Sequence, residues 1–144
     1  MDLNDPNGQV TALIDRYVSM WNEPDADERC RAIHELWADD GRHVLEAPED
    51  MRSAAKALGF PPLVLEVCGH AALEFRVTTA FNEFIAPGQY RFRSRGNGAR
   101  LCDLIKFNWE MIVVASGDVA AVGTEIFQLD STGKISADYQ FIEN

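Results

Sequence analysis

The order of the hydrophobic patterns along this chain constrains its fold more than any other feature. Apolar residues recur at helical spacing in the first segment, at Val10, Leu13, Ile14, Tyr17, Val18 and Trp21. A second helical stripe follows Asp25, with Glu28 three residues later in the spacing of a capping box. Two tight-turn sequences then separate three strand-like runs, over 101–114, 119–129 and 134–142. Helices followed by an antiparallel meander predict one α+β domain, with helices packed against one face of a curved sheet.

The middle of the chain is less regular. Short strands are expected at 42–45, 63–67 and 90–95, and the sequence Trp37–Gly41 is read as the turn that ends the second helix. A third long helix is expected from about Gly69, with Pro87 ending it. Residues 47–62 combine prolines with a short helical pattern over 51–58. We interpret them as an excursion between two paired strands and as a lid over the mouth of the fold.

Length and composition exclude several classes of protein. The 144 residues form a single predicted domain over 1–144, and 47% hydrophobic residues are enough for a core. A net charge of −10 argues against a nucleic-acid partner, and no apolar run is long enough for a membrane helix. The start of the chain lacks the pattern of a signal peptide, so we expect a cytoplasmic protein. One basic cluster departs from this trend and is read either as a solvated strand face or as an anion-binding rim: Arg91, Arg93, Arg95 and Arg100.

Motifs for bound groups are missing from the sequence. The three cysteines and three histidines have no metal-binding spacing, and there is no glycine-rich phosphate loop or nucleophile elbow. We therefore expect no metal and no cofactor.

Several short motifs fall in the order seen in SnoaL-like proteins of the nuclear transport factor 2-like superfamily. They are Ile14–Val18, Asn22–Asp25, Leu36–Gly41, Gly69-x-Ala71-x-Leu73, Lys106–Glu110 and Leu129–Ile135, and the resemblance extends over residues 10–142. The resemblance implies a cone-shaped, cystatin-like barrel of three helices in a curved, mixed, largely antiparallel sheet, often as a homodimer. Polyketide cyclases, ketosteroid isomerase, limonene epoxide hydrolase and scytalone dehydratase share this scaffold with non-catalytic modules, so the fold does not give the function.

Three carboxylates are candidate catalytic groups. Asp103 has the strand parity of the apolar residues that follow it, and its alternative is a solvated position at the sheet rim. Glu125 matches the position of a protonated aspartic acid in ketosteroid isomerase, and its alternative is a hydrogen-bonded structural role. The resemblance turns Asp138 and Gln140 toward the pocket, whereas hydrophobicity alone would turn Tyr139 and Phe141 inward.

Other candidates come from the first helix and the first strand. The resemblance implies that Tyr17 stabilises an oxyanion, and a core role is the alternative. His43 is a candidate base or a structural histidine. The residue before Pro48 is Ala47, where ketosteroid isomerase has its general base, which argues against steroid isomerase activity. Candidate ligand contacts are Trp21, Trp37, Phe107, Trp109 and Gln140, with packing as the alternative for Trp21 and Trp37.

Three functions fit these observations. The first is a cofactor-independent cyclase, isomerase or dehydratase that acts on a small apolar ring compound through acid–base carboxylates. The second is a binding module for such a compound, without chemistry. The third is a dimerisation domain whose cone is filled by its own aromatic side chains.

Overall fold

The computed structural model describes residues 6–143 and contains four α-helices in that range. Helices α1 (Pro6–Asn22) and α2 (Ala26–Leu36) follow the two predicted stripes. Asp25 caps α2, because its carboxylate accepts the backbone N–H groups of Asp27 and Glu28. The third long helix, α4 (His70–Ala80), runs on into a π-helical turn, η1 (Phe81–Ile85).

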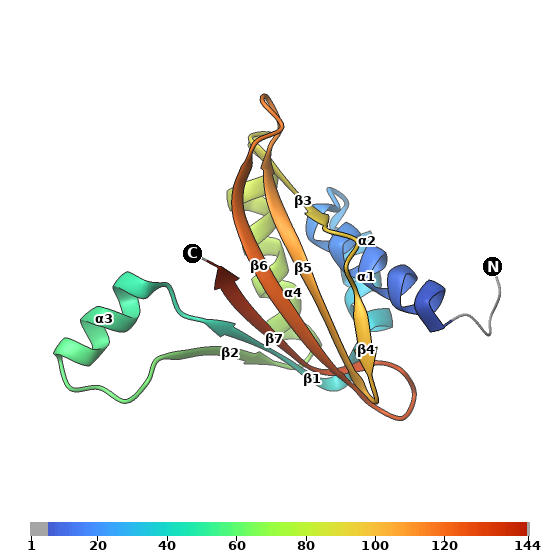
Figure 1. Cartoon of the computed structure of the whole chain (residues 1–144), viewed down its shortest axis with the longest axis horizontal. Helices are drawn as coiled ribbons and strands as arrows, with labels where there is room; N and C mark the ends of the chain where they lie inside the picture. The colour runs from blue at the N-terminus through green and yellow to red at the C-terminus, as the bar shows by residue number, and fades with distance from the viewer. Residues whose placement is uncertain (1–5, 144) are drawn as a thin grey trace.

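Seven strands form one mixed sheet that bends strongly along its length (Figure 1). They are β1 (Trp37–Glu46), β2 (Val64–Cys68), β3 (Tyr90–Ser94), β4 (Ala99–Leu101), β5 (Leu104–Val113), β6 (Val119–Leu129) and β7 (Ile135–Glu143). The strand order is β2-β1-β7-β6-β5-β3, with β4 also paired to β5. Only the β1–β7 pair is parallel among these strands, so the predicted mixed, largely antiparallel sheet is confirmed.

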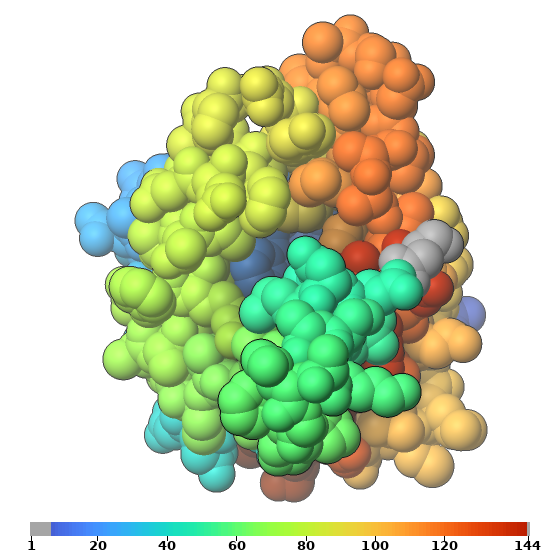
Figure 2. Space-filling view, turned by 90° about the vertical axis from the view of Figure 1, so that its left-hand side faces the viewer, coloured from blue at the N-terminus to red at the C-terminus, as the bar shows by residue number. Residues whose placement is uncertain are grey.

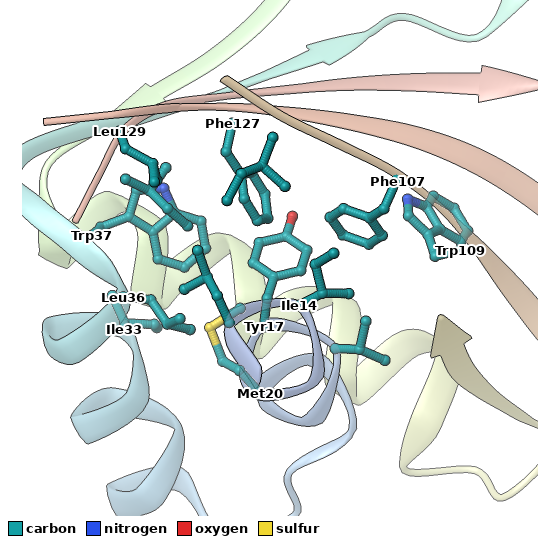
Figure 3. Packing of buried hydrophobic residues seen from close by; sticks show 14 of the residues in the cluster. Ile14, Tyr17, Met20, Ile33, Leu36, Trp37, Phe107, Trp109, Phe127 and Leu129 are labelled. Carbon is teal, nitrogen blue, oxygen red and sulfur yellow. The ribbon is translucent and has the colours of Figure 1, made fainter. Parts of the chain in front are cut away.

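The core lies where α1 and α2 meet the concave side of the sheet (Figure 3). Tyr17 stands at its centre, with ring centroids 4.7 Å from Phe127, 5.6 Å from Trp37 and 5.9 Å from Phe107. These rings come from α1, the start of β1 and two neighbouring strands, so their packing fixes α1 against the sheet. The hydroxyl of Tyr17 is the polar end of this aromatic cluster.

Two sequence predictions about strand starts are wrong. Trp37–Gly41 is not simply a turn, because β1 already begins at Trp37. The pairing of β1 with β7 shifts register between Trp37 and Arg42, as at a β-bulge. Strand β5 begins at Leu104 rather than at residue 101, because Cys102 adopts a left-handed backbone (φ 54°) and forms a turn with Asp103. The alternation of β5 therefore does not extend back to Asp103.

The predicted excursion contains helix α3 (Glu49–Ala57), carried at the end of the β1–β2 hairpin. Figure 1 shows α3 standing away from the body of the sheet, and none of its residues is buried. None of the helices within residues 6–143 is both long enough and apolar enough to cross a membrane.

Candidate functional site

The bent sheet and the helices enclose a cavity of about 580 Å³. Figure 2 looks into its mouth, which is bordered by α3 and by the α4–η1 segment, with α1 visible at the bottom of the hollow. Its walls are mostly apolar and include Val18, Trp21, Phe92, Trp109, Met111 and Ile142. The volume lies within the range of about 300–1,000 Å³ that is typical of small-molecule sites.

A cluster of polar side chains in and beside the cavity wall comes from three adjacent strands. Register places Asp138 of β7 opposite Phe127 of β6 on one side and His43 of β1 on the other. Two residues further along, Gln140 lies opposite Glu125. Because side chains alternate along a strand, Asp138 and Gln140 share a face, and that face is the concave one. The inward orientation implied by the resemblance is thus the observed one, and Phe141 is exposed.

Tyr17 and Asp138 form a buried hydrogen-bonded pair. The Tyr17 hydroxyl donates to Asp138 Oδ2 at 2.6 Å, and both side chains are almost fully buried. Burial, followed by the charges of Asp138 and Glu125, raises the pKa of Tyr17 well above 10.0, so the phenol keeps its proton. That proton is directed at Asp138, which differs from the expected role of Tyr17 as a donor to a ligand oxyanion.

Glu125 is a buried carboxylic acid whose surroundings favour its protonated form. Its side chain is fully buried, and the indole Nε1–H of Trp109 donates to its Oε1 at 2.9 Å. Burial, followed by the negative charge of Asp138, raises the pKa of Glu125 well above its ordinary value of 4.5. The second oxygen, Oε2, has no hydrogen-bond partner among the described residues. Glu125 lines the cavity, and it is the fully buried one of the three described acidic residues that do so, the others being Glu46 and Glu83.

A glycine allows Trp109 to reach Glu125. Gly123 lies directly opposite Trp109 in the β5–β6 pair. A Cβ atom at position 123 would lie 2.1 Å from Cζ2 and 2.6 Å from Nε1 of Trp109. The indole therefore lies flat over the bare Cα of Gly123, which no other residue type would permit in this geometry.

His43 connects two further cavity residues. Its Nε2 lies 2.9 Å from Gln140 Oε1, and its Nδ1 lies 3.0 Å from Arg76 Nη1. A guanidinium group can only donate, so Nδ1 must accept and the proton of the neutral ring must be on Nε2. Burial, reinforced by the charge of Arg76 and opposed by that of Asp138, lowers the pKa of His43 below 6.5. His43 is thus neutral and bonded at both nitrogens.

The structure brings together most of the predicted site residues and separates three of them. Tyr17, Glu125 and Gln140 line the cavity together with Trp21 and Trp109. Asp138 and His43 do not line it, but they are hydrogen-bonded to Tyr17 and Gln140 respectively. Trp37 and Phe107 are instead fully buried in the aromatic core and do not line the cavity. Asp103 is exposed in the β4–β5 turn, 3.9 Å from Arg100, because β5 starts after it.

Sequence reasoning missed Arg76 and the role of Gly123. Arg76 lies three residues after Leu73 and one before Val77, on the apolar stripe of α4. A lone charged residue on such a stripe was the available signal. Nothing in the sequence marks Gly123, because its importance depends on a cross-strand neighbour.

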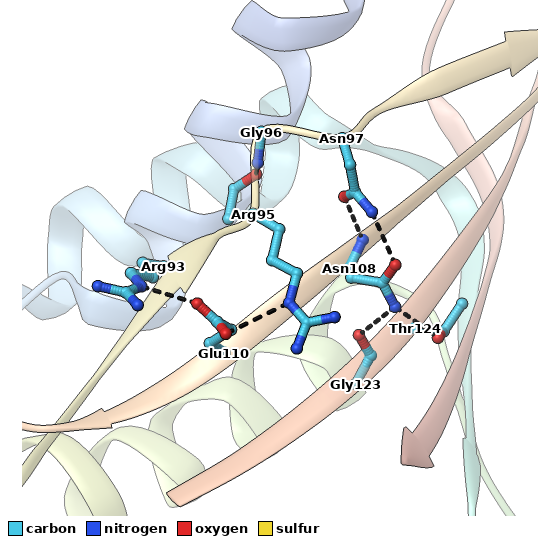
Figure 4. A network of polar contacts seen from close by, with 9 residues as sticks. Arg93, Arg95, Gly96, Asn97, Asn108, Glu110, Gly123 and Thr124 are labelled. Atoms are coloured by element: carbon cyan, nitrogen blue, oxygen red, sulfur yellow. Dashed lines mark hydrogen bonds and ion pairs between the residues drawn. The ribbon is translucent and has the colours of Figure 1, made fainter. Parts of the chain in front are cut away.

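The basic cluster lies outside this site. Figure 4 shows Glu110 of β5 between two of its arginines, with Arg93 Nε 2.9 Å from Oε1 and Arg95 Nε 3.3 Å from Oε2. None of the cluster lines the cavity. The interpretation as a solvated strand face is therefore the better one.

A metal ion is a further use that this group of side chains suggests. Ligand atoms of His43, Glu125 and Asp138 all lie within 4.8 Å of one another. However, His43 Nε2 is already hydrogen-bonded to Gln140, and Asp138 Oδ2 already accepts the hydroxyl proton of Tyr17. A proton on Glu125 accounts for the closeness of the two carboxyl groups without breaking either bond.

Comparison with known proteins identifies the fold. A scan of protein-family models and a search of curated proteins found no match to this chain. Solved structures match over nearly its whole length. A SnoaL-like family isomerase candidate from Agrobacterium tumefaciens superposes with a TM-score of 0.75 at 23% identity, covering 95% of this chain and 99% of the other.

Two further structures support the same assignment. An NTF2-like protein of unknown function from Exiguobacterium has a TM-score of 0.63 at 19% identity, covering 92% of this chain and 98% of the other. TerC, co-crystallised with polyporic acid, has a TM-score of 0.56 at 15% identity, with 91% of each chain covered. The chain therefore has the α+β fold of SnoaL-like and NTF2-like proteins, as its sequence motifs indicated.

Proposed function

We propose that this protein binds a small, largely apolar ring compound in its cavity and acts on it by cofactor-independent acid–base chemistry. The observation that carries the proposal is Glu125, a fully buried carboxylic acid in the wall of an apolar cavity, with a pKa raised by burial and by the neighbouring Asp138. A carboxylic acid in this environment favours its protonated form and can donate the proton to an oxygen or carbon of a ligand. Isomerisation, cyclisation and dehydration are reaction classes that such a proton transfer can catalyse.

The other polar residues support Glu125 in this role. Asp138 does not line the cavity, and its negative charge behind Glu125 favours the protonated acid. Tyr17 holds Asp138 through its hydroxyl, and Trp109 orients Glu125 through Oε1. Glu125 is therefore the proposed catalytic residue, and Asp138, Tyr17 and Trp109 are positioning residues. The volume of the cavity favours a ligand over a cone filled by its own side chains.

The ligand class can be tested by thermal unfolding with aromatic polyketide-like, terpenoid and steroid compounds. A ligand at 100 times its dissociation constant adds about 2.7 kcal/mol of stability. In a domain of this size that raises the melting temperature by roughly 5–10 °C. The TerC complex makes polyporic acid a reasonable first compound. No shift across the panel would count against a ligand site.

Chemistry is tested separately from binding. For a compound that binds, NMR in D₂O would follow exchange of ring protons and formation of an isomer or cyclised product. Glu125→Gln keeps the size of the side chain and its bond to Trp109 but removes the acidic proton, so we expect unchanged binding and loss of turnover. Asp103→Asn, at the exposed turn, is the control and should behave as wild type. Turnover that persists in Glu125→Gln would refute the proposed role, and binding without any turnover in the wild type would favour a binding module.

The homodimer implied by the resemblance stays a prediction. Sedimentation of the purified protein tests it directly, since the monomer has a mass of 16.1 kDa.

A further inference from the structure

Arg76 places a positive charge at an apolar cavity, where the charge of Asp138 acts on it without a direct ion pair. It is half-buried on α4 and is the one basic residue among the described residues that line the cavity. Its Nη1 donates to His43 Nδ1 at 3.0 Å and to the carbonyl oxygens of His43 and Leu65 at 3.2 and 3.3 Å. No carboxylate of residues 6–143 forms an ion pair with it, and its Nε and Nη2 make no hydrogen bond within this range. The Nε and Nη2 donors of this guanidinium group are thus free to bind a ligand.

Gln140 offers a second unused donor beside the first. Its Oε1 accepts the Nε2–H of His43, so its amide NH₂ group points away from His43. That NH₂ group has no partner among the described residues, and Gln140 lines the cavity. His43 is the common partner of both side chains and holds each by one nitrogen. Its fixed tautomer therefore orients both donors.

We propose that Arg76 and Gln140 form a carboxylate-binding site in the wall of the cavity, so that the ligand is a ring compound bearing a carboxylate. This inference rests on the proposed function and specifies its substrate class. Guanidinium groups bind carboxylates through charge-assisted hydrogen bonds, which are stronger than neutral ones and are strengthened further by poor solvation. Phe92, Trp109, Met111 and Ile142 provide the apolar surface for the ring.

The acidic residues of the cavity do not compete for the same position. Glu46 ends β1 and lies 4.0 Å from Arg52 of α3, and Glu83 is exposed on η1. The raised pKa of Glu125 favours its uncharged form, which does not repel an anion. Among the described residues that line the cavity, Arg76 is thus the one positive group available to the carboxylate of a ligand.

The test compares 2-naphthoate with the neutral isostere 2-naphthamide by isothermal titration calorimetry at pH 7.5. We expect the wild type to bind 2-naphthoate about tenfold more tightly or better, as for one charged hydrogen bond gained. Arg76→Gln should abolish this preference while 2-naphthamide binds as before. Arg93→Gln, which removes an arginine outside the cavity, is the matched control and should keep the preference.

Gln140→Glu decides the question if Arg76→Gln fails to fold. This variant keeps an oxygen that accepts from His43 but replaces the NH₂ donor by an acidic oxygen, so 2-naphthoate should bind at least about tenfold more weakly and 2-naphthamide should be little affected. Equal binding of the two probes by the wild type would overturn this inference and leave the proposed function standing. Binding of neither probe at millimolar concentration would overturn both.

Discussion

Replacing Gly123 by alanine tests the link between the sheet and Glu125. The new methyl group would lie 2.1 Å from Trp109 Cζ2 and 2.2 Å from Cε2, far inside contact distance. Strand β6 cannot simply move away, because Asn108 Nδ2 donates to the carbonyl oxygen of Gly123 at 3.2 Å and to Thr124 Oγ1 at 2.8 Å (Figure 4). The indole must therefore leave, and its hydrogen bond to Glu125 is lost.

The magnitude follows from these two effects. Overpacking of a filled site costs about 1–3 kcal/mol. Leaving Glu125 Oε1 without its donor in a fully buried position costs about 1–3 kcal/mol more. With a sum of about 4 kcal/mol and roughly 3 °C for each kcal/mol in a chain of this length, the melting temperature should fall by about 12 °C. Circular dichroism and urea unfolding measure this loss, and tryptophan fluorescence reports the displaced indole.

A double-mutant cycle identifies the cause. Trp109→Leu removes the atoms with which the new methyl group would clash. In that background Gly123→Ala should be neutral or slightly stabilising, because alanine restricts the unfolded chain more than glycine does. An equal loss of stability in both backgrounds would refute the argument, as would a wild-type melting temperature for Gly123→Ala alone.

Three further predictions concern the buried polar groups. Tyr17→Phe removes the donor to Asp138 Oδ2, so at pH 7 the free energy of unfolding measured in urea should fall by about 1–3 kcal/mol; an unchanged value would mean that water replaces the hydroxyl. The pKa of His43 is lowered in the folded state, so as the pH falls the unfolded chain takes up a proton before the folded one. The contribution of His43 to stability is therefore complete above pH 6.5 and is lost as the pH falls below that value. His43→Gln should flatten this part of the stability profile, and an unchanged slope would assign the pH dependence to another group. The raised pKa of Glu125 has the opposite sign, since the folded state holds the proton longer, so its contribution is complete below pH 4.5 and is lost as the pH rises through the folded-state value. Glu125→Gln should remove this falling component in urea titrations above pH 4.5, and identical profiles for the two proteins would contradict a raised pKa.

Local sequence patterns predicted the elements well where the residues concerned are neighbours in the chain. The stripe from Val10 to Trp21 became α1, and the run 119–129 became β6 with the same bounds. Errors occurred where a turn depends on a single backbone conformation. Cys102 in the left-handed region moves the start of β5, and with it Asp103 leaves the inward face.

The sequence by itself determined the order of helices and strands, the α+β class and the apolar faces, because all of these follow from periodicity within one element. It also marked Glu125 and Asp138 as carboxylates on largely apolar strands. Only the tertiary structure decided what those carboxylates can do. The charge on Glu125 depends on burial and on Asp138 of the neighbouring strand β7, and the tautomer of His43 depends on Arg76 of α4. Such properties arise from distances between residues far apart in the chain, and no local pattern encodes them.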